Sequence, residues 1–296
     1  MGILLGLSSA FFFGTASLLL RVGMRTSPRD DGLFMTFVVN VFVLGVVGLF
    51  VSKPEWSAVG VATLAGAGLI GGVGGRFSNF RAIRHIGATR ASVFVIGSPL
   101  VTAAAGWVVL EESLRLVEVI GGLLVLASQS LLIRARSSAE GVPGAGEGQH
   151  PPAIGYVYAA AASILIGLAF VLRKWGLRSF DSVVLGALIG VLAALVFLVF
   201  IDVGMGRLRA RISDNFDDVN WWFAGAGVML SFALITQFWA FSFTAAWVVG
   251  VLQGTQAIWV LVLSYILLKG EERIDLTVVA SVAVAVAGVT LIAVNG

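Results

Sequence analysis

The chain has 296 residues, of which 58% are hydrophobic and only 12% are charged. Soluble globular proteins carry roughly 45–50% apolar and about 25% charged residues, so this composition excludes a soluble enzyme, a nucleic-acid-binding protein and a disordered chain. The net charge of +3 at pH 7 is small, and we assign the basic residues to loops that face lipid headgroups. The sequence predicts an integral membrane protein.

Apolar runs about one bilayer long alternate along the chain with clusters of charged residues. In chain order the clearest runs are 1–20, 56–75, 91–110, 182–201 and 276–296. Each suits a spanning helix, which needs about 20 mostly apolar residues. The uncharged interval 219–268 would reach about 75 Å as a single helix, so we expect it to turn once, at the polar residues 242–244. Eight charged clusters and this turn make nine connections and predict ten transmembrane helices.

The apolar runs predict helices and not strands. They are continuous over about 20 residues, whereas the strands of a membrane barrel alternate over about 10 residues. The fold class is therefore all-α. Three pairs of glycines four positions apart lie within the runs: Gly68/Gly72, Gly71/Gly75 and Gly186/Gly190. Such pairs let helix backbones approach closely in lipid, and we interpret them as packing contacts.

A polar stretch rich in Gly, Pro and Ser lies near the middle of the chain. It covers 135–152 and predicts a linker between two halves, 1–134 and 153–296. Each half contains five of the predicted helices. We interpret the halves as copies of one repeat, because aligned positions match in the same order, including Gly14 with Gly167, Gly23 with Gly176, and Glu111-Glu112 with Glu271-Glu272.

The odd number of helices in each copy has a geometric consequence. A five-helix repeat ends on the opposite side of the membrane from its start, so the second copy is inverted relative to the first. Inverted repeats are typical of secondary transporters, in which one site at the repeat interface opens to either side in turn. The sequence therefore favours a secondary carrier.

Segments 91–99, 107–114 and 121–127 resemble the core signature of the EamA family in the drug/metabolite transporter superfamily. That signature has a Pro in the fourth helix, a Gly-Glu-Arg-like turn and a Gly-rich fifth helix. The second half repeats the turn at 269–273, but it lacks the Pro, since Ile258 or Trp259 stands there. In the first turn Glu111 replaces the usual Gly. The resemblance implies a ten-helix carrier for small organic metabolites that does not hydrolyse ATP.

Polar residues at membrane depth are costly, and we take them as candidate substrate contacts. In the first half they are Asn40 on the second helix, and Arg76 and Asn79, which share a face of the third. In the second half they are Gln237, Trp239, Gln253, Gln256 and Trp259. Each amide has a simpler interpretation as an interhelical hydrogen bond, and Arg76 as a side chain that reaches the headgroups. A positive, amide-rich interior without a mid-span carboxylate favours an amino-acid-like zwitterion or an anion as substrate.

The sequence indicates no catalytic residues, no cofactor and no metal site. The chain has no Cys, and His85 and His150 fall in a predicted loop and in the linker. The expected partners are a small-molecule substrate and membrane lipid, without nucleic acid, and the chain is a monomer or a homodimer. The expected location is a prokaryotic plasma membrane, crossed many times, with both termini on one side. Which side they face stays open.

Three alternatives stand beside the carrier. A lipid or lipid-linked-sugar flippase shares the fold and differs in whether its groove opens laterally to lipid. An integral-membrane enzyme needs a nucleophile with its base, or a carboxylate cluster, near one interface. The carboxylate pairs Glu111/Glu112 and Glu271/Glu272 end helices in matching positions, which suits gates or turn caps better than catalysis. A structural or receptor subunit would not need a polar lining at mid-membrane depth.

Overall fold

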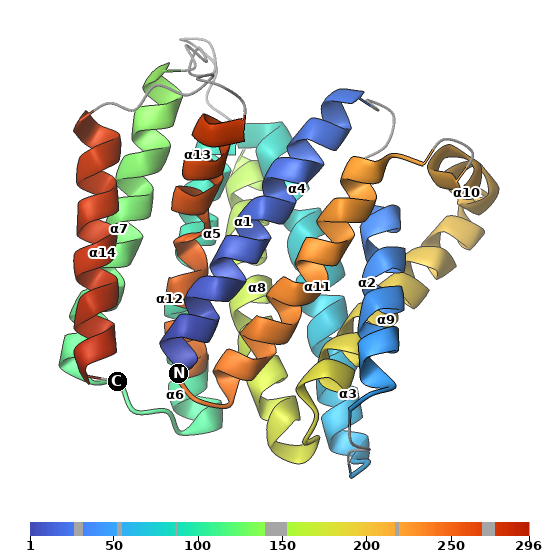
Figure 1. Ribbon diagram of the computed structural model, residues 1–296, viewed down its shortest axis with the longest axis horizontal. Helices are drawn as coiled ribbons and strands as arrows, with labels where there is room; N and C mark the ends of the chain where they lie inside the picture. The colour runs from blue at the N-terminus through green and yellow to red at the C-terminus, as the bar shows by residue number, and fades with distance from the viewer. Residues whose placement is uncertain are drawn as a thin grey trace.

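The computed structural model describes residues 1–26, 32–51, 55–86, 88–139, 153–216, 219–267 and 276–295, and their regular structure is helical (Figure 1). The first half contains α1 (Gly2–Thr26), α2 (Leu33–Gly48), α3 (Ala58–Ala67), the π-helix η1 (Gly68–Gly75), α4 (Arg76–Ile86), α5 (Ala88–Ile96), α6 (Ser98–Leu110) and α7 (Leu116–Ala139). The second half contains α8 (Ala153–Ser179), α9 (Val183–Gly204), α10 (Leu208–Phe216), α11 (Trp221–Phe241), α12 (Ala246–Gly254), α13 (Gln256–Leu267) and α14 (Leu276–Asn295).

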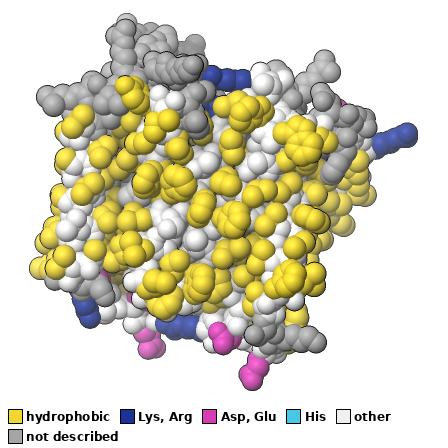
Figure 2. Space-filling model, viewed as in Figure 1, with side chains coloured by type: hydrophobic (Ala, Val, Ile, Leu, Met, Phe, Trp, Pro, Cys, Tyr) yellow, Lys and Arg dark blue, Asp and Glu magenta, His cyan; other side chains and the backbone are white. Residues whose placement is uncertain are grey.

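Within the described residues, seven helices or continuous runs of helices are long and apolar enough to cross a bilayer. Three shorter apolar helices accompany them: Leu33–Gly48, Leu116–Leu132 and Val279–Val294. On the face shown in Figure 2, hydrophobic side chains cover the middle, and charged side chains lie at the edges. An apolar belt between two charged rims is the surface that a bilayer requires, so the chain is a multi-pass integral membrane protein.

The expected turn in the long uncharged interval is confirmed. Helix α11 ends at Phe241 and α12 begins at Ala246, on either side of the residues 242–244. Helices extend beyond the apolar runs, so the expectation that His85 and the basic residues from Arg173 onward lie in loops was wrong. Helix α7 continues to Ala139, past the predicted linker start at 135, and residues 140–152 with His150 lie outside the described part. His85 belongs to the last turn of α4, and the basic residues from Arg173 onward belong to α8.

The helices pack in pairs that correspond between the two halves. Helix α1 lies against α11, and α8, which occupies the same place in the second half, lies against α3, η1 and α4. Helix α2 packs against α9, and α7 packs against α14. In Figure 1, α1 and α8 run in opposite directions, and α1 begins at the same end of the bundle at which α14 ends. We call this the termini end.

Small residues allow the closest of these contacts. A Cβ atom added at Gly68 would overlap the carbonyl group of Gly190, so η1 and α9 meet backbone to backbone. One turn away, a Cβ at Gly71 would lie 2.5 Å from the Cβ of Ala169 on α8. The glycines of η1 therefore hold this segment between α8 and α9, as their spacing predicted. A π-helix inside a longer helix often marks a functional site, and η1 borders the cavities described below.

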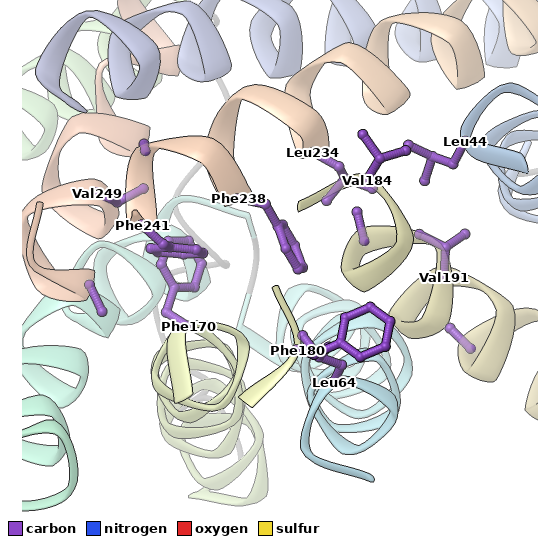
Figure 3. Close-up of a cluster of buried hydrophobic side chains, with 14 of the residues drawn as sticks. Leu44, Leu64, Phe170, Phe180, Val184, Val191, Leu234, Phe238, Phe241 and Val249 are labelled. Carbon is purple, nitrogen blue, oxygen red and sulfur yellow. The ribbon is translucent and has the colours of Figure 1, made fainter. Parts of the chain in front are cut away.

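Aromatic side chains fill the core beside η1. Phe170 and Phe241 lie edge to face with their ring centroids 5.8 Å apart, and Phe238 and Phe241 are 6.0 Å apart (Figure 3). Edge-to-face pairs at this separation stabilise a core beyond the area they bury. This cluster joins α8 to α11, and two of its rings, Phe170 and Phe238, lie against the guanidinium of Arg173.

Candidate functional site

Two transmembrane segments are interrupted at matching places in the two halves. Helices α5 and α6 are separated at Gly97, and helices α12 and α13 are separated at Thr255. At each break a tight turn replaces the α-helical bond: Gly97 N–H donates to the carbonyl of Phe94 at 2.9 Å, and Thr255 N–H donates to that of Leu252 at 3.0 Å. Paired interruptions in corresponding segments are the feature that best locates a transporter's binding site.

The two breaks differ in sequence. Gly97-Ser98-Pro99 surrounds the first and Gly254-Thr255-Gln256 surrounds the second. Pro99 has no N–H to donate and ends the bonding of the first segment. At the second break the backbone lies close to α7, because a Cβ atom at Gly254 would overlap the side-chain amide of Gln129.

A cavity of about 400 Å³, which we call the central cavity, lies between the two breaks. Both halves contribute to its wall: Asn79, Ser92, Val95, Ile96, Ser98, Pro99, Gln129, Ile166, Phe170, Gly250, Gln253, Gly254, Gln256 and Ala257. Its volume is within the range of roughly 300–1,000 Å³ that is usual for small-molecule sites. The wall mixes apolar surface with amide and hydroxyl groups, and no Asp or Glu lines it among the described residues.

A chain of hydrogen bonds runs from the edge of this cavity into the protein, and we call it the amide chain. Arg173 donates from Nη1 to Gln237 Oε1 at 2.7 Å, and Gln237 donates from Nε2 to Gln253 Oε1 at 3.3 Å. Gln253 then donates to Gln256 Oε1 at 3.4 Å, and Gln256 donates to Ser17 Oγ at 2.9 Å. The chain joins α8, α11, α12, α13 and α1, so it links the two halves through polar groups.

A second, smaller cavity of about 70 Å³ lies beside η1. Arg76, Arg173 and Asn40 provide its polar groups, and the remaining wall is aromatic, aliphatic or glycine. Arg76 lies over the ring of Phe37, with the guanidinium carbon 5.3 Å from the ring centroid, and Arg173 lies over Phe170 and Phe238 at 5.5 and 5.8 Å. Cation–π contacts of this kind hold a charged side chain in place inside an apolar environment.

The structure divides the predicted site residues among four locations. Asn79, Gln253 and Gln256 line the central cavity, and Asn40 and Arg76 line the smaller one. Arg76 and Asn79, expected on one face, therefore belong to different cavities. Gln237 is 1% exposed and lies between the two. The two tryptophans are elsewhere: Trp239 is 49% exposed on the outer surface, and Trp259 packs edge to face on Phe11 with centroids 5.2 Å apart.

Arg173, Ser9 and Gln129 belong to the site and were not predicted. Arg173 was assigned to a loop because three other charges follow it before position 182. The alignment of the two halves sets Lys174 opposite Arg21, and α1 continues past Arg21 to Thr26. A helix that continues past Arg173 in the same way would have placed this residue inside the bundle. Ser9 donates to Gln253 Oε1 at 3.1 Å and to the carbonyl of Ala233 at 2.9 Å, a pairing across helices that sequence spacing does not reveal.

A buried ion pair joins the two halves at the termini end of the bundle. Lys174 Nζ lies 2.8 Å from Glu112 Oε1, and the two side chains are 17% and 6% exposed. Glu112 Oε1 also accepts the N–H of Ala246 at the start of α12, and Lys174 donates to the carbonyl of Thr244 at 2.7 Å. These contacts connect the α6–α7 loop, α8 and the α11–α12 turn, and they form one wall of a depression of about 620 Å³.

Glu111, next to this ion pair, has a left-handed backbone with φ 55°. That conformation favours glycine, which explains why the turn of the resembled family has a Gly at this position. The same turn directs Glu112 inward, where its Oε2 atom sits over Gly106, 2.9 Å from a Cβ atom placed there. No cluster of three or more His, Asp or Glu residues occurs in the part of the chain that the structure describes.

A polar cavity between two interrupted membrane helices is an arrangement in which membrane transporters bind their substrates. A comparison with protein families identifies the family of this chain: the model of the EamA-like transporter family matches residues 1–134 and 153–294. The chain belongs to this family, and its resemblance to it is confirmed. Members of the family are membrane transporters of the drug/metabolite superfamily.

A solved structure titled only as the crystal structure of a protein is similar to the chain over its whole length. The two are 19% identical, and the similarity covers 98% of this chain and 94% of the other with a TM-score of 0.73. At this identity the likeness concerns the fold. No curated protein matches the chain.

Proposed function

We propose that the protein is a secondary carrier that moves a small organic metabolite by alternating access. In this proposal the seven long and three shorter apolar segments are ten spans, arranged as two inverted five-helix repeats. The observation that carries it is the pair of breaks at Gly97 and Thr255, which occupy corresponding segments and meet at one central cavity. Irregular backbone at membrane depth is tolerated where it lines such a cavity.

The wall of the central cavity suggests the class of substrate. Its polar groups are amides and hydroxyls, which donate and accept hydrogen bonds without carrying charge. One charge, the guanidinium of Arg173, is linked to the cavity wall through Gln237. A wall without carboxylates disfavours a cation, since nothing would neutralise it on leaving water. We infer an amino-acid-like zwitterion or an anion.

A counterflow assay in liposomes tests this function. Vesicles that contain the purified protein are loaded with millimolar amounts of one candidate from a panel of amino acids, sugars and nucleosides, and uptake of the radiolabelled candidate is followed. We expect trans-stimulated uptake of an amino acid or another carboxylate, with at least a tenfold loss in Gln253→Leu. Ser8→Ala is the matched control, because Ser8 bonds only to the carbonyl of Leu4 in its own helix. Equal uptake into vesicles with and without internal substrate would contradict a carrier.

A flippase is the second candidate, and one observation favours it. An almost entirely apolar groove of about 380 Å³ runs between α6, α7 and α12, and Pro99 lines both this groove and the central cavity. A lipid could pass its headgroup into the cavity and keep its chains in the groove. The same vesicles distinguish the two functions: transbilayer movement of a labelled lipid without counterflow of any solute would replace the carrier by the flippase.

A further inference from the structure

The amides in the wall of the central cavity differ in whether the protein already pairs them. Gln253 Oε1 accepts hydrogen bonds from Ser9 and Gln237, which occupies both of its lone pairs. Gln253 Nε2 donates to Gln256 Oε1, and Gln256 Nε2 donates to Ser17. All four polar atoms of these two glutamines therefore have a partner within the protein, and their first role is to hold the amide chain together.

Two other amides of the same wall have buried atoms that no hydrogen bond reaches. They are the Oδ1 atom of Asn79, on α4, and the Nε2 atom of Gln129, on α7, and neither has a partner in the part of the chain that the structure describes. Gln129 is only 6% exposed and lies against Gly254 at the second break. Both residues line the central cavity. Since a buried polar atom without a partner is costly, such atoms in the wall of a cavity point to a ligand that pairs them.

The two atoms have opposite requirements. Asn79 Oδ1 is an acceptor and needs a donor, whereas Gln129 Nε2 is a donor and needs an acceptor. A molecule that carries an ammonium group and a carboxylate supplies both. It also has no net charge, which lowers the cost of placing it at membrane depth compared with an anion.

We propose that Asn79 and Gln129 recognise the substrate, with Asn79 accepting from its ammonium group and Gln129 donating to its carboxylate. The inference rests on the proposed carrier function and narrows the substrate from a zwitterion or an anion to a zwitterion. An anion without a donor would leave Asn79 Oδ1 buried and unpaired.

The rest of the wall indicates what the substrate carries beside these two groups. Val95, Ile96, Ile166 and Phe170 give it an apolar surface, which suits an amino acid with an apolar side chain. L-Leucine is therefore the probe. Isocaproate is leucine without its ammonium group, and isoamylamine is leucine without its carboxylate, so the two analogues remove the two interactions one at a time.

Competition in the counterflow assay tests the proposal, with radiolabelled L-leucine and an unlabelled competitor outside the vesicles. We expect isocaproate and isoamylamine each to compete at least tenfold more weakly than leucine, because each analogue leaves one buried atom of the site without a partner. If another amino acid of the panel gives faster counterflow than leucine, that amino acid and its own two analogues take the place of the leucine series.

Two variants distinguish recognition from a structural role. Asn79→Leu removes the acceptor, so leucine should lose its advantage over isocaproate and keep its advantage over isoamylamine. Gln129→Leu removes the donor and should have the converse effect. We expect each variant to change one ratio at least fivefold and to leave the other within about twofold, whereas a merely structural defect weakens all three ligands alike.

A conservative variant and a matched control complete the design. Asn79→Asp keeps an acceptor at the same place and should keep the preference for leucine over isocaproate. Ser130→Ala should give the ratios of the parent, because Ser130 donates to the carbonyl of Leu126 in its own helix at 3.1 Å and does not line the central cavity. The competition in the parent protein needs no variant, so it decides the question even where a leucine variant does not fold.

Two results overturn the proposal. The first is competition by isocaproate or isoamylamine in the parent that equals competition by leucine. The second is unchanged ratios in both Asn79→Leu and Gln129→Leu, which would make the two amides packing groups. Absence of counterflow for every solute of the panel contradicts the carrier itself, so failure of this inference and failure of the proposed function give different results.

Discussion

Gln237 is the residue on which the site's polar contacts depend. It is almost fully buried, its oxygen receives a charged hydrogen bond from Arg173, and its nitrogen reaches Gln253. A neutral amide accepts and donates hydrogen bonds at separate, fixed atoms, so it can relay orientation between a guanidinium and a second amide. Inside an apolar bundle each of these groups is costly without its partner.

Replacing Gln237 by Leu therefore affects both of its neighbours. The substitution keeps the volume and removes the acceptor of Arg173 and the donor to Gln253, and we expect a loss of about 1–3 kcal/mol in stability. Thermal unfolding in detergent measures it. Thr236→Val is the matched control, because Thr236 is half-buried and bonds to carbonyls of its own helix. Equal melting temperatures for the two variants would show that the chain of amides is incidental.

The residue types of the site could be predicted from the sequence better than their positions could. Intramembrane Asn, Gln and Arg side chains stand out by their solvation cost, and this cost singled out Gln253 and Gln256, which line the central cavity. The tryptophans carry no such cost, because an indole ring is as stable against lipid as inside the bundle, and Trp239 indeed lies at the surface. Arg173 was missed because it begins a cluster of charged residues. From the sequence alone, an arginine at the end of a helix cannot be distinguished from one that faces a cavity.

At the scale of elements, the glycines of η1 decide how closely three helices pack. Gly68 faces the backbone of Gly190, whereas Gly66, two positions earlier, faces open space. Alanine has the higher helix propensity at both positions, so propensity alone would stabilise either variant. The two sites differ only in the room for a methyl group.

We therefore expect opposite outcomes from one substitution at two neighbouring positions. Gly68→Ala forces η1 and α9 apart and should cost about 1–3 kcal/mol, as overpacking of a core does. Gly66→Ala should leave the protein unchanged or slightly more stable. Chemical or thermal unfolding of the purified proteins measures both. A Gly68→Ala variant as stable as Gly66→Ala would mean that the contact with Gly190 is looser than the structure has it.

The spans could be predicted from hydrophobicity because burial in lipid dominates all other terms. The uncharged turn at 242–244 was found for the same reason, since 50 apolar residues cannot cross once. The interruptions at Gly97 and Thr255 were not found, and neither was the π-helical course of η1. These depend on which carbonyl a given N–H reaches, and apolar runs give no sign of that choice except at Pro99.

At the scale of the whole molecule, contacts at the termini end join parts of the two halves that the proposed alternating access would separate. Glu112 belongs to the first half, and its partners Lys174 and the Ala246 N–H belong to the second. Arg178 adds a hydrogen bond of 2.6 Å to the carbonyl of Leu110, again between the halves. Alternating access requires such contacts to be strong enough to close one end and weak enough to open.

Glu112→Gln tests whether the ion pair holds this end closed. The glutamine oxygen can still accept the N–H of Ala246, but Lys174 loses its counter-charge, and about 1–3 kcal/mol of the closed state should be lost. A shift of that size raises the population of the open state about 5–150-fold. Because the chain has no Cys, Val248→Cys places a single reporter in the wall of the same depression, at a residue that is only 2% exposed.

The rate at which a polar thiol reagent modifies that cysteine measures opening of the termini end. We expect slow modification in Val248→Cys alone and at least fivefold faster modification when Glu112→Gln is added. Glu118→Gln is the control, because Glu118 lines the same depression and its removal changes the charge equally without touching Lys174. If both substitutions accelerate modification alike, the effect is electrostatic attraction of the reagent and not the opening of a gate, and the closed end must be held by the apolar contacts around Phe241 instead.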